Sequence, residues 1–141
     1  METIQIRGNK NSDILIGEKF ENINQYIPKN TKVIIITDIN IYKLYRKKFP
    51  SNHIIMICSG EKSKTLNTVN KIYKKLIKYQ ATRNVFLLGV GGGIVCDITG
   101  FVASTYLRGV RFGFVSTTLL SQVDASVGGK NGVNFRGYKN M

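Results

Sequence analysis

The residues between 117 and 134 could carry out chemistry on a bound ligand. Hydroxyls, one carboxylate, paired glycines and a lysine follow one another there, in the order Thr117-Thr118-Leu119-Leu120-Ser121-Gln122-Val123-Asp124-Ala125-Ser126-Val127-Gly128-Gly129-Lys130-Asn131-Gly132-Val133-Asn134. A structural turn needs only a few special residues, whereas glycines among several polar groups let backbone N–H groups approach a ligand closely. The pattern is typical of neither a helix nor a strand, so we expect a ligand-binding loop.

A glycine cluster upstream has the features of a phosphate-binding turn. The chain reads Val90-Gly91-Gly92-Gly93 after an apolar run and then enters a helical pattern, which places backbone donors and the positive end of a helix dipole together. The G-x-G-x-x-G fingerprint is not met, because Ile94 stands where a glycine is required. A tight turn without a ligand is an equal alternative for the glycines alone. Asp97, one turn further, points back toward this turn or serves only as a first-turn acid.

Two more polar segments follow predicted strands. Thr37-Asp38-Ile39-Asn40 offers a carboxylate and an amide, and Asp38 suits either a nucleoside or a helix N-cap. Ser59-Gly60-Glu61-Lys62-Ser63-Lys64-Thr65 follows the next strand along the chain. Because open α/β sheets bind ligands outside the carboxyl ends of their strands, we expect these segments and the glycine cluster to border one cleft.

The elements that position these residues alternate between strands and helices. Strands are expected at 32–37, 53–58, 85–89 and 110–115, and the first three are continuous apolar runs, as in parallel strands covered on both faces. Helices long enough to cross between them are expected at 39–49, 65–80 and 94–107. The predicted fold class is therefore α/β, with a Rossmann-like parallel sheet and crossover helices in a single domain over residues 1–141.

A short β-hairpin is expected before the sheet. Residues 3–7 and 13–16 would form its strands around Gly8-Asn9-Lys10-Asn11, and a short amphipathic helix follows with Phe20, Ile23 and Ile27 on one side.

Length and composition are those of one globular core. The 141 residues are 43% hydrophobic, and no window approaches the roughly 20 apolar residues that a membrane-spanning helix needs. The amino terminus lacks a signal-peptide pattern, so we expect a cytoplasmic protein with no membrane partner. Cys58 and Cys96 are expected to be reduced, buried thiols. His53, the only histidine, is expected to have a core or strand-edge role because no other ligand stands at metal-binding spacing.

The chain is strongly basic, with 21 Lys and Arg against 8 Asp and Glu and a net charge of +13. The charges are scattered, and one group of lysines is predicted on a helix face opposite an apolar stripe: Lys71, Lys74, Lys75 and Lys78 against Leu66, Val69, Ile72, Leu76 and Tyr79. Arginine-rich tails, zinc-finger spacings and RNA-binding aromatic patterns are absent from the sequence. We therefore expect solvated charges, with a general attraction to phosphorylated small molecules as the alternative and no nucleic-acid partner.

Taken together, the motifs resemble the amino-terminal domain of 3-dehydroquinate synthases. The resemblance runs over residues 91–134 through three glycines, an aspartate four residues after the last, Arg-Gly, Thr-Thr-Leu-Leu, Val-Asp-Ala-Ser-Val-Gly-Gly-Lys and Gly-Val-Asn. Ser116 replaces a usual proline, Tyr138 a usual glycine and Cys96 a common small residue, all beside ligand positions. The resemblance implies NAD as cofactor and conversion of 3-deoxy-D-arabino-heptulosonate 7-phosphate, a phosphorylated sugar acid, to 3-dehydroquinate and phosphate.

The resemblance also implies a set of site residues. Those that would contact NAD are Asp38, Asn40, Ser59, Gly60, Glu61, Lys62, Ser63, Lys64, Gly92, Gly93, Ile94, Val95, Cys96, Asp97, Thr117, Thr118, Lys130 and Lys139. Among them, Asp97 would lie against the nicotinamide, and Glu61 and Lys64 against the adenosine. Those that would act on the substrate are Arg108, Asp124, Lys130, Lys139 and Asn140. Arg108 would reach in from the neighbouring subunit of a homodimer; from sequence alone, an exposed cation at a helix end is the favoured alternative.

A divalent metal, zinc or cobalt, is implied in the complete enzyme, with its ligands in a helical carboxyl-terminal domain absent from this sequence. We therefore expect residues 1–141 to be the NAD-binding half of a longer two-domain enzyme with no metal ligands of its own. The alternatives are a related sugar-phosphate cyclase, a metal-dependent polyol dehydrogenase and, from another class, a basic nucleic-acid-binding module. The segment 123–130 argues against the dehydrogenases, which are not expected to carry it.

Overall fold

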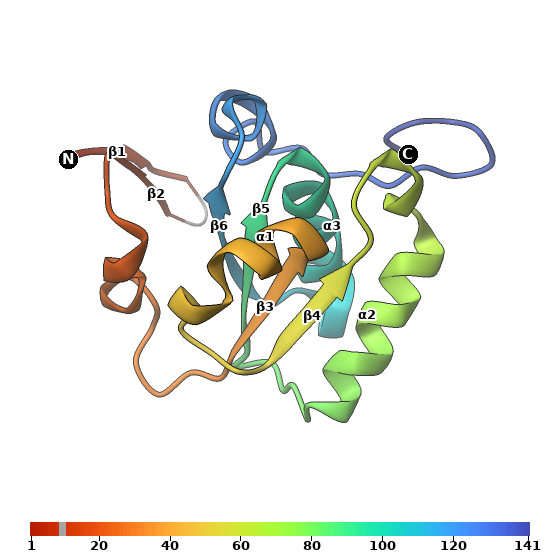
Figure 1. The fold of residues 1–141 in the computed structure, drawn as a ribbon, viewed down its shortest axis with the longest axis horizontal. Helices are drawn as coiled ribbons and strands as arrows, with labels where there is room; N and C mark the ends of the chain where they lie inside the picture. The colour runs from red at the N-terminus through yellow and green to blue at the C-terminus, as the bar shows by residue number, and fades with distance from the viewer. Residues whose placement is uncertain (9–10) are drawn as a thin grey trace.

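The centre of the molecule is a four-stranded parallel sheet (Figure 1). In the computed structural model, which describes residues 1–8 and 11–141, the strands are β3 (Val33–Asp38), β4 (Ile54–Ile57), β5 (Phe86–Gly91) and β6 (Arg111–Ser116). Their order is β4-β3-β5-β6, and each neighbouring pair is parallel. The predicted α/β class and all four predicted strands are confirmed, with bounds that shift by one or two residues.

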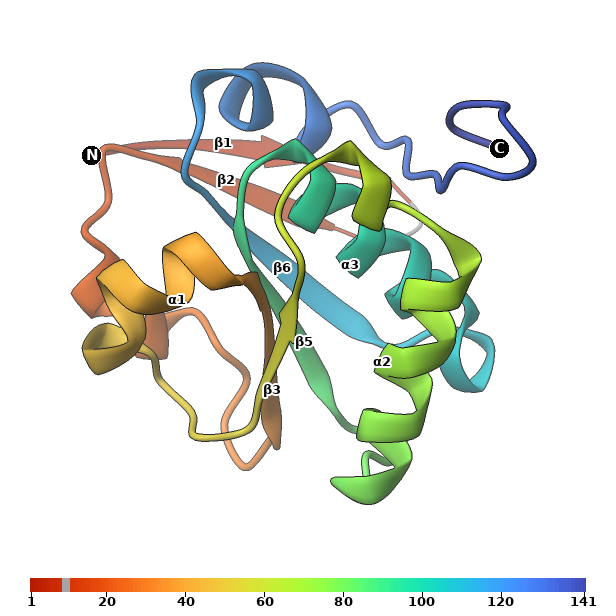
Figure 2. The ribbon, with the colours of Figure 1, turned by 45° about the vertical axis from the view of Figure 1, so that its right-hand side comes forward.

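Helices cover both faces of this sheet (Figure 2). The helices α2 (Leu66–Lys78) and α3 (Gly93–Thr105) pack on one face against strand residues such as Ile34, Ile36 and Leu87. On the other face, α1 (Ile39–Tyr45) and the 3-10 helix Phe20–Gln25 cover a smaller cluster around Ile35, Leu88 and Val90. Since adjacent residues of the central strands β3 and β5 are buried on opposite faces, these two strands read as continuous apolar runs.

The strand order reverses between β3 and β5. From β3 the chain passes through α1 to β4 on one side, and β5 then joins β3 on its other side. The two strands are locked near their carboxyl ends, where Thr37 pairs with Val90 and donates its Oγ1 hydrogen to the Val90 carbonyl at 2.8 Å. Such a reversal leaves a crevice beyond the strand ends, because the following loops separate to opposite faces of the sheet.

All three predicted crossover helices end earlier than the apolar pattern indicates, and the one predicted at 65–80 stops at Lys78. The helix predicted at 39–49 stops at Tyr45 and continues only as a 3-10 turn over Arg46–Lys48. The helix predicted at 94–107 stops at Thr105, because Leu107 and Arg108 take left-handed φ values of 48° and 67°. The short amphipathic helix also ends at Gln25, which leaves Ile27 outside it. Apolar spacing continues through these turns and therefore does not mark where the α-helix ends.

The loop predicted without helix contains one helical turn. Ser121–Ala125 form a π-helical turn, in which the Ser126 N–H donates to the Ser121 carbonyl at 3.0 Å. The Ser121 side chain is fully buried and bonds to Thr118, which holds the turn against the chain that precedes it. The prediction of no helix here was wrong, since local side-chain hydrogen bonds stabilise the turn without apolar periodicity.

The predicted hairpin is confirmed as β1 (Glu2–Ile6) and β2 (Ser12–Ile16), which form an antiparallel sheet of their own. Asn9 and Lys10, in the predicted connection, lie outside the described residues.

The two cysteines differ in environment. Cys96 is buried in α3, whereas Cys58 is exposed, and both are free thiols. The prediction that Cys58 is buried was wrong, because this residue lies just beyond the end of β4, an edge strand. His53 precedes the same strand and packs edge-on against Tyr79 at 5.0 Å, which confirms its strand-edge role.

The basic face of α2 is solvated, as expected. Val69, Ile72 and Leu76 are buried, while Lys71, Lys74, Lys75 and Lys78 are exposed. Leu66 at the start of the helix is exposed, contrary to its predicted place in the apolar stripe. Across the described residues, none of the helices combines the length and apolar character needed to span a membrane.

Candidate cofactor-binding cleft

A cleft of about 650 Å³ opens at the carboxyl ends of the parallel strands. This volume lies within the roughly 300–1,000 Å³ usual for small-molecule and cofactor sites. The predicted site residues that line it come from all four strand ends: Asp38, Asn40, Ser59, Gly60, Glu61, Lys64, Gly92, Gly93, Ile94, Val95, Asp97, Thr117, Thr118, Asp124 and Asn140. The expectation that the separate polar segments border one cleft is therefore confirmed.

Several residues of the predicted set lie outside the lining of this cleft. Ser63 is buried and donates its hydroxyl hydrogen to the Gly60 carbonyl at 2.8 Å, while the neighbouring Lys62 is exposed. Cys96 is buried within α3, and Lys130 and Lys139 are exposed. The fold thus brings together the main part of the set and leaves these five beside it.

Arg108 lies at the opposite edge of the sheet. The helix α3 begins at the cleft with Gly93 and ends at Thr105, so Arg108 is separated from the cleft by its whole length, roughly 20 Å. Its side chain is exposed, as the alternative of a solvated cation at a helix end requires. Within one copy of this chain, Arg108 does not border the cleft.

Four apolar residues complete the lining and were not predicted as site residues: Ile41, Ile57, Leu120 and Ala125. Each stands within three residues of a predicted polar one, so proximity to the strand ends was the available signal. Apolar residues are usually found in the core, so the residue types at these four positions did not indicate a role in ligand binding.

The amino terminus of α3 forms one wall of the cleft. Gly92 is the N-cap, and no side chain accepts a hydrogen bond from the first turn. The N–H groups of that turn have no partner within the helix, so they present partial positive charge at the cleft. A side chain at Gly91 would place Cβ 2.5 Å from Val95 Cγ2, so the tight entry into the helix requires glycine there. Backbone donors with this geometry suit an anionic group.

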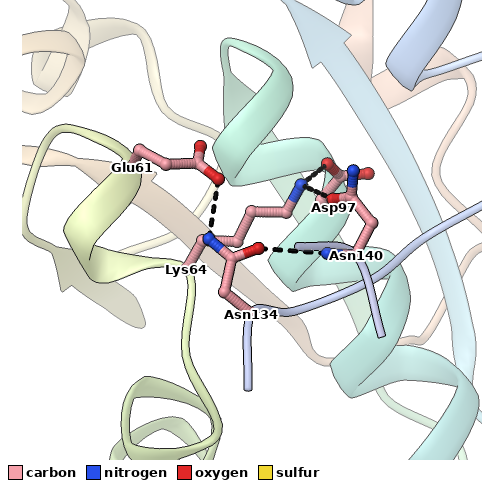
Figure 3. A network of polar contacts seen from close by, with 5 residues as sticks. All are labelled: Glu61, Lys64, Asp97, Asn134 and Asn140. Carbon is pink, nitrogen blue, oxygen red and sulfur yellow. Dashed lines mark hydrogen bonds and ion pairs between the residues drawn. The ribbon is translucent and has the colours of Figure 1, made fainter. Parts of the chain in front are cut away.

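Two residues that line the cleft, Lys64 and Asp97, form a buried ion pair (Figure 3). Lys64 is only 5% exposed, and its ammonium group pairs with the carboxylate of Asp97. The same ammonium donates to Asn140 Oδ1 at 2.5 Å. Asp97 therefore binds Lys64 rather than capping α3, and its partner is a residue that the sequence places in a different segment. Burying an ammonium group without such partners would cost several kcal/mol, on the order of the penalty for any unpaired buried ion.

Asp38 caps α1 and also borders the cleft. Its Oδ1 accepts hydrogen bonds from the Asn40 and Ile41 N–H groups at 2.8 and 3.0 Å, and from Ser59 Oγ at 3.4 Å. The helix-cap alternative for Asp38 is thus confirmed. Among the hydrogen bonds of residues 1–8 and 11–141, none uses Oδ2 of this carboxylate.

The hydroxyl of Thr117 and the thiol of Cys96 are both buried near the start of α3 or the end of β6, and they differ in whether they could interact with a ligand. Thr117 Oγ1 is buried and has no hydrogen-bond partner within the described part of the chain. An unsatisfied hydroxyl costs about 1–3 kcal/mol, so a ligand that supplies a partner would be favoured. Burial raises the pKa of the Cys96 thiol to about 11, so this thiol stays neutral at physiological pH and is no nucleophile.

Metal-binding side chains do not cluster in the part of the chain that is described. No three His, Cys, Asp or Glu side chains there lie close enough together to hold a metal ion.

Comparison with known proteins identifies the family. Residues 54–141 match the family described as 3-dehydroquinate synthase N-terminal. The 3-dehydroquinate synthase of Clostridium tetani is 38% identical over 152 aligned positions, which cover 100% of this chain and 41% of that protein. The 3-dehydroquinate synthase of Pyrococcus abyssi is 45% identical over 130 positions, which cover 86% of this chain and 36% of that protein. The chain thus spans about two fifths of the length of these curated relatives.

Solved structures agree with this match. A 2-deoxy-scyllo-inosose synthase in complex with carbaglucose-6-phosphate, NAD+ and Co2+ superposes with a TM-score of 0.88 at 29% identity, covering 99% of this chain and 41% of that one. The match to more than half of the chain, over the segment that supplies most of the cleft lining, shows that it belongs to the 3-dehydroquinate synthase family and carries the amino-terminal domain of that family.

Proposed function

We propose that this chain binds NAD in the cleft and supplies the cofactor-binding half of a 3-dehydroquinate synthase active site. The observation that carries the proposal is the meeting of uncapped N–H groups of α3 with polar side chains from all four strand ends. The structural relative with the TM-score of 0.88 is itself an NAD complex, and it covers the whole of this cleft region. When bound, NAD would accept a hydride from the substrate and return it.

The residues present fit the parts of NAD. The first turn of α3, from Gly92 to Val95, would receive the pyrophosphate on its free N–H groups. Asp38 keeps Oδ2 available for a ribose hydroxyl, and the Asn40 side chain would lie beside it. The Glu61 carboxylate would contact the adenosine portion.

At the other end of the cofactor, Asp97, held by its ion pair with Lys64, would lie against the nicotinamide. The Thr117 hydroxyl would gain from the cofactor the hydrogen-bond partner that it lacks in the described residues, and Thr118 would contact the cofactor beside it.

We propose further that the substrate is a phosphorylated sugar acid, 3-deoxy-D-arabino-heptulosonate 7-phosphate. Asp124 and Asn140 border the cleft and would bind its hydroxyl groups. Lys130 and Lys139 are exposed outside the lining of the cleft and would move onto the substrate or cofactor when these bind. The net charge of +13 favours the approach of such anions.

The remaining parts of the site would come from outside the described residues of one chain. A divalent metal, zinc or cobalt, would be held by the further length that the curated relatives possess, because no suitable cluster stands among the described residues. Exposed apolar side chains in and before the π-helical turn, of which Leu120 lines the cleft, support a covering domain: Leu119, Leu120 and Val123 are 74%, 66% and 65% exposed. Arg108 would reach a second active site across a homodimer. We propose a cytoplasmic location for the enzyme.

Phosphate release tests this proposal. The protein that includes this chain and the remaining length of its relatives should release phosphate from 3-deoxy-D-arabino-heptulosonate 7-phosphate only with NAD and a divalent metal. A protein that is folded by circular dichroism but releases no phosphate under these conditions would contradict the assigned substrate. Turnover by residues 1–141 alone would contradict the assignment of the metal site to another segment.

A further inference from the structure

The terminal segment 132–141 reaches the cleft from a distance in the sequence. It contributes Asn140, whose side chain accepts a hydrogen bond from Lys64, 76 residues away. Most of the segment is exposed, and its buried anchors are Gly132 and Val133. The segment closes on itself, since the Met141 N–H donates to the Val133 carbonyl at 2.8 Å. What holds this closed loop against the cleft therefore decides where Asn140 lies.

Asn134 makes three hydrogen bonds with residues that line the cleft, and Figure 3 shows the two made by its side chain. Its backbone N–H donates to the Lys64 carbonyl at 2.8 Å. Its side-chain Nδ2 donates to Glu61 Oε1 at 2.7 Å, and its side-chain Oδ1 accepts from the Asn140 N–H at 3.1 Å. One side chain thus joins the turn after β4 to the end of the terminal loop, while Asn134 itself stays outside the lining of the cleft.

The chemistry of the amide fits this place. Glu61 presents a carboxylate, which only accepts, and Asn140 presents an N–H, which only donates. A carboxamide meets both because it carries a donor and an acceptor on one planar group. An aspartate of the same shape would keep the bond to Asn140 but turn a second acceptor toward Glu61, so the choice of asparagine is specific.

We propose that Asn134 is a positioning residue for cofactor binding, a role that rests on the proposed binding of NAD. It fixes the Glu61 carboxylate and the Asn140 backbone N–H relative to each other, and the Asn140 side chain in turn accepts a hydrogen bond from the Lys64 ammonium, which pairs with Asp97. Three cleft residues from two distant segments are thereby set in one geometry before the cofactor arrives, which reduces the ordering cost of binding.

The test exchanges donor and acceptor between the two partners in the full-length protein. Asn134→Asp should raise the dissociation constant of NAD at least ~10-fold by calorimetry, because two carboxylates then face each other. It should also speed hydrogen exchange in the peptide that covers residues 132–141. Glu61→Gln combined with Asn134→Asp restores a donor–acceptor pair, so exchange should return toward wild type. NAD binding by the pair should be at least ~5-fold tighter than the product of the two single effects predicts.

The matched control is Asn70→Asp on the exposed face of α2, which makes the same change of charge and should leave NAD binding and exchange unaltered. If wild type binds NAD and Asn134→Asp binds it equally well, or the double variant gains nothing over the single effects, Asn134 does not position the site. If wild type binds no NAD at all, the proposed function and this role both fail, whereas a failure of this role alone leaves wild-type binding intact. The double variant keeps the test decisive if Asn134→Asp unfolds.

Discussion

At the scale of single residues, the cleft depends on charges that are buried only because they are paired. Lys64 and Asp97 have 6% and 18% of their side-chain surface exposed, and each lies where an unpaired ion would be strongly disfavoured. The pair places a carboxylate at the cleft without leaving a net charge in the core. Its contribution to function is a fixed geometry rather than additional stability, since buried ion pairs roughly offset their own desolvation.

The losses caused by removing the two partners should therefore not be additive. Asp97→Ala leaves the Lys64 ammonium with Asn140 as its remaining side-chain partner and should lower the free energy of unfolding by about 3 kcal/mol. Lys64→Met combined with Asp97→Ala should cost clearly less than the two single changes added together. Urea unfolding followed by circular dichroism measures all three variants. Additive losses would mean that the two side chains do not depend on each other.

The two thiols should react very differently. Burial raises the pKa of Cys96 from 9.0 to about 11, so at pH 8 roughly one thiol in a thousand is ionised even before access is considered. We expect a thiol reagent to label one exposed cysteine, Cys58, rapidly in the folded protein, and the second only on unfolding. A Cys58→Ser variant should show no rapid labelling, and rapid labelling of that variant would contradict the burial of Cys96.

The same shift predicts a dependence of stability on pH. Because the pKa is raised in the folded state, the unfolded thiol loses its proton first, and the stabilising contribution is full below pH 9 and lost between pH 9 and about 11. Cys96→Ala should lack this part of the alkaline decline, while Cys58→Ser should keep it. Equal alkaline slopes of the unfolding free energy in wild type and Cys96→Ala would contradict the shift.

At the scale of elements, the start of α3 separates glycines needed for packing from glycines needed for access. Alanine at Gly91 would place Cβ 2.5 and 2.7 Å from two atoms of Val95, a β-branched side chain with little freedom to move. Alanine at Gly93 would meet only Ala125 Cβ, at 3.5 Å, but would project from a residue that lines the cleft.

These two alanine variants should fail in different ways. Gly91→Ala should lower the free energy of unfolding by about 1–3 kcal/mol through overpacking. Gly93→Ala should change stability by less than about 0.5 kcal/mol yet weaken NAD binding at least ~10-fold, because the methyl group keeps a phosphate away from the helix N–H groups. Thermal unfolding and calorimetric titration of both variants give the comparison. If Gly93→Ala binds NAD with wild-type affinity, the N-terminus of α3 does not take part in NAD binding.

The elements were predictable where local pattern decides them. Continuous apolar runs identified β3 and β5, which are covered on both faces, and also the edge strand β4, in which Met56 is 44% exposed. The entry into α3 was predictable from its glycines. The ends of α1 and α3 were not, since the left-handed φ of Leu107 and the 3-10 turn at Arg46 leave no mark in apolar spacing.

Within the cleft, sequence reasoning found the residues but not their partners. Asp97 and Lys64 were each assigned to the site, yet nothing in their separate segments indicates that they pair. Asn134 lies 73 residues from Glu61, and its hydrogen bonds exist only because the terminal loop folds back across α3. Contacts of this kind depend on topology, which a pattern along the chain does not contain.

At the scale of the whole molecule, the sheet converts separate segments into one site. The reversal of strand order between β3 and β5 opens a crevice, and the loop after each strand brings polar groups to its rim. The chain spans about two fifths of its curated relatives, so the proposed enzyme would use this cleft as one wall of a larger site. We therefore expect residues 1–141 alone to bind NAD weakly, with a dissociation constant on the order of 1 mM or above.

The most direct test is a titration of NAD into the isotope-labelled 141-residue chain, followed by backbone amide NMR shifts. The largest shifts should fall on Gly93, Ile94 and Val95 at the start of α3, with smaller ones at Asp38 and Glu61. Shifts confined to the lysine face of α2 would indicate nonspecific attraction of an anion. That result, or a folded protein whose spectrum does not change at saturating NAD, would contradict the account of the cleft as a cofactor site.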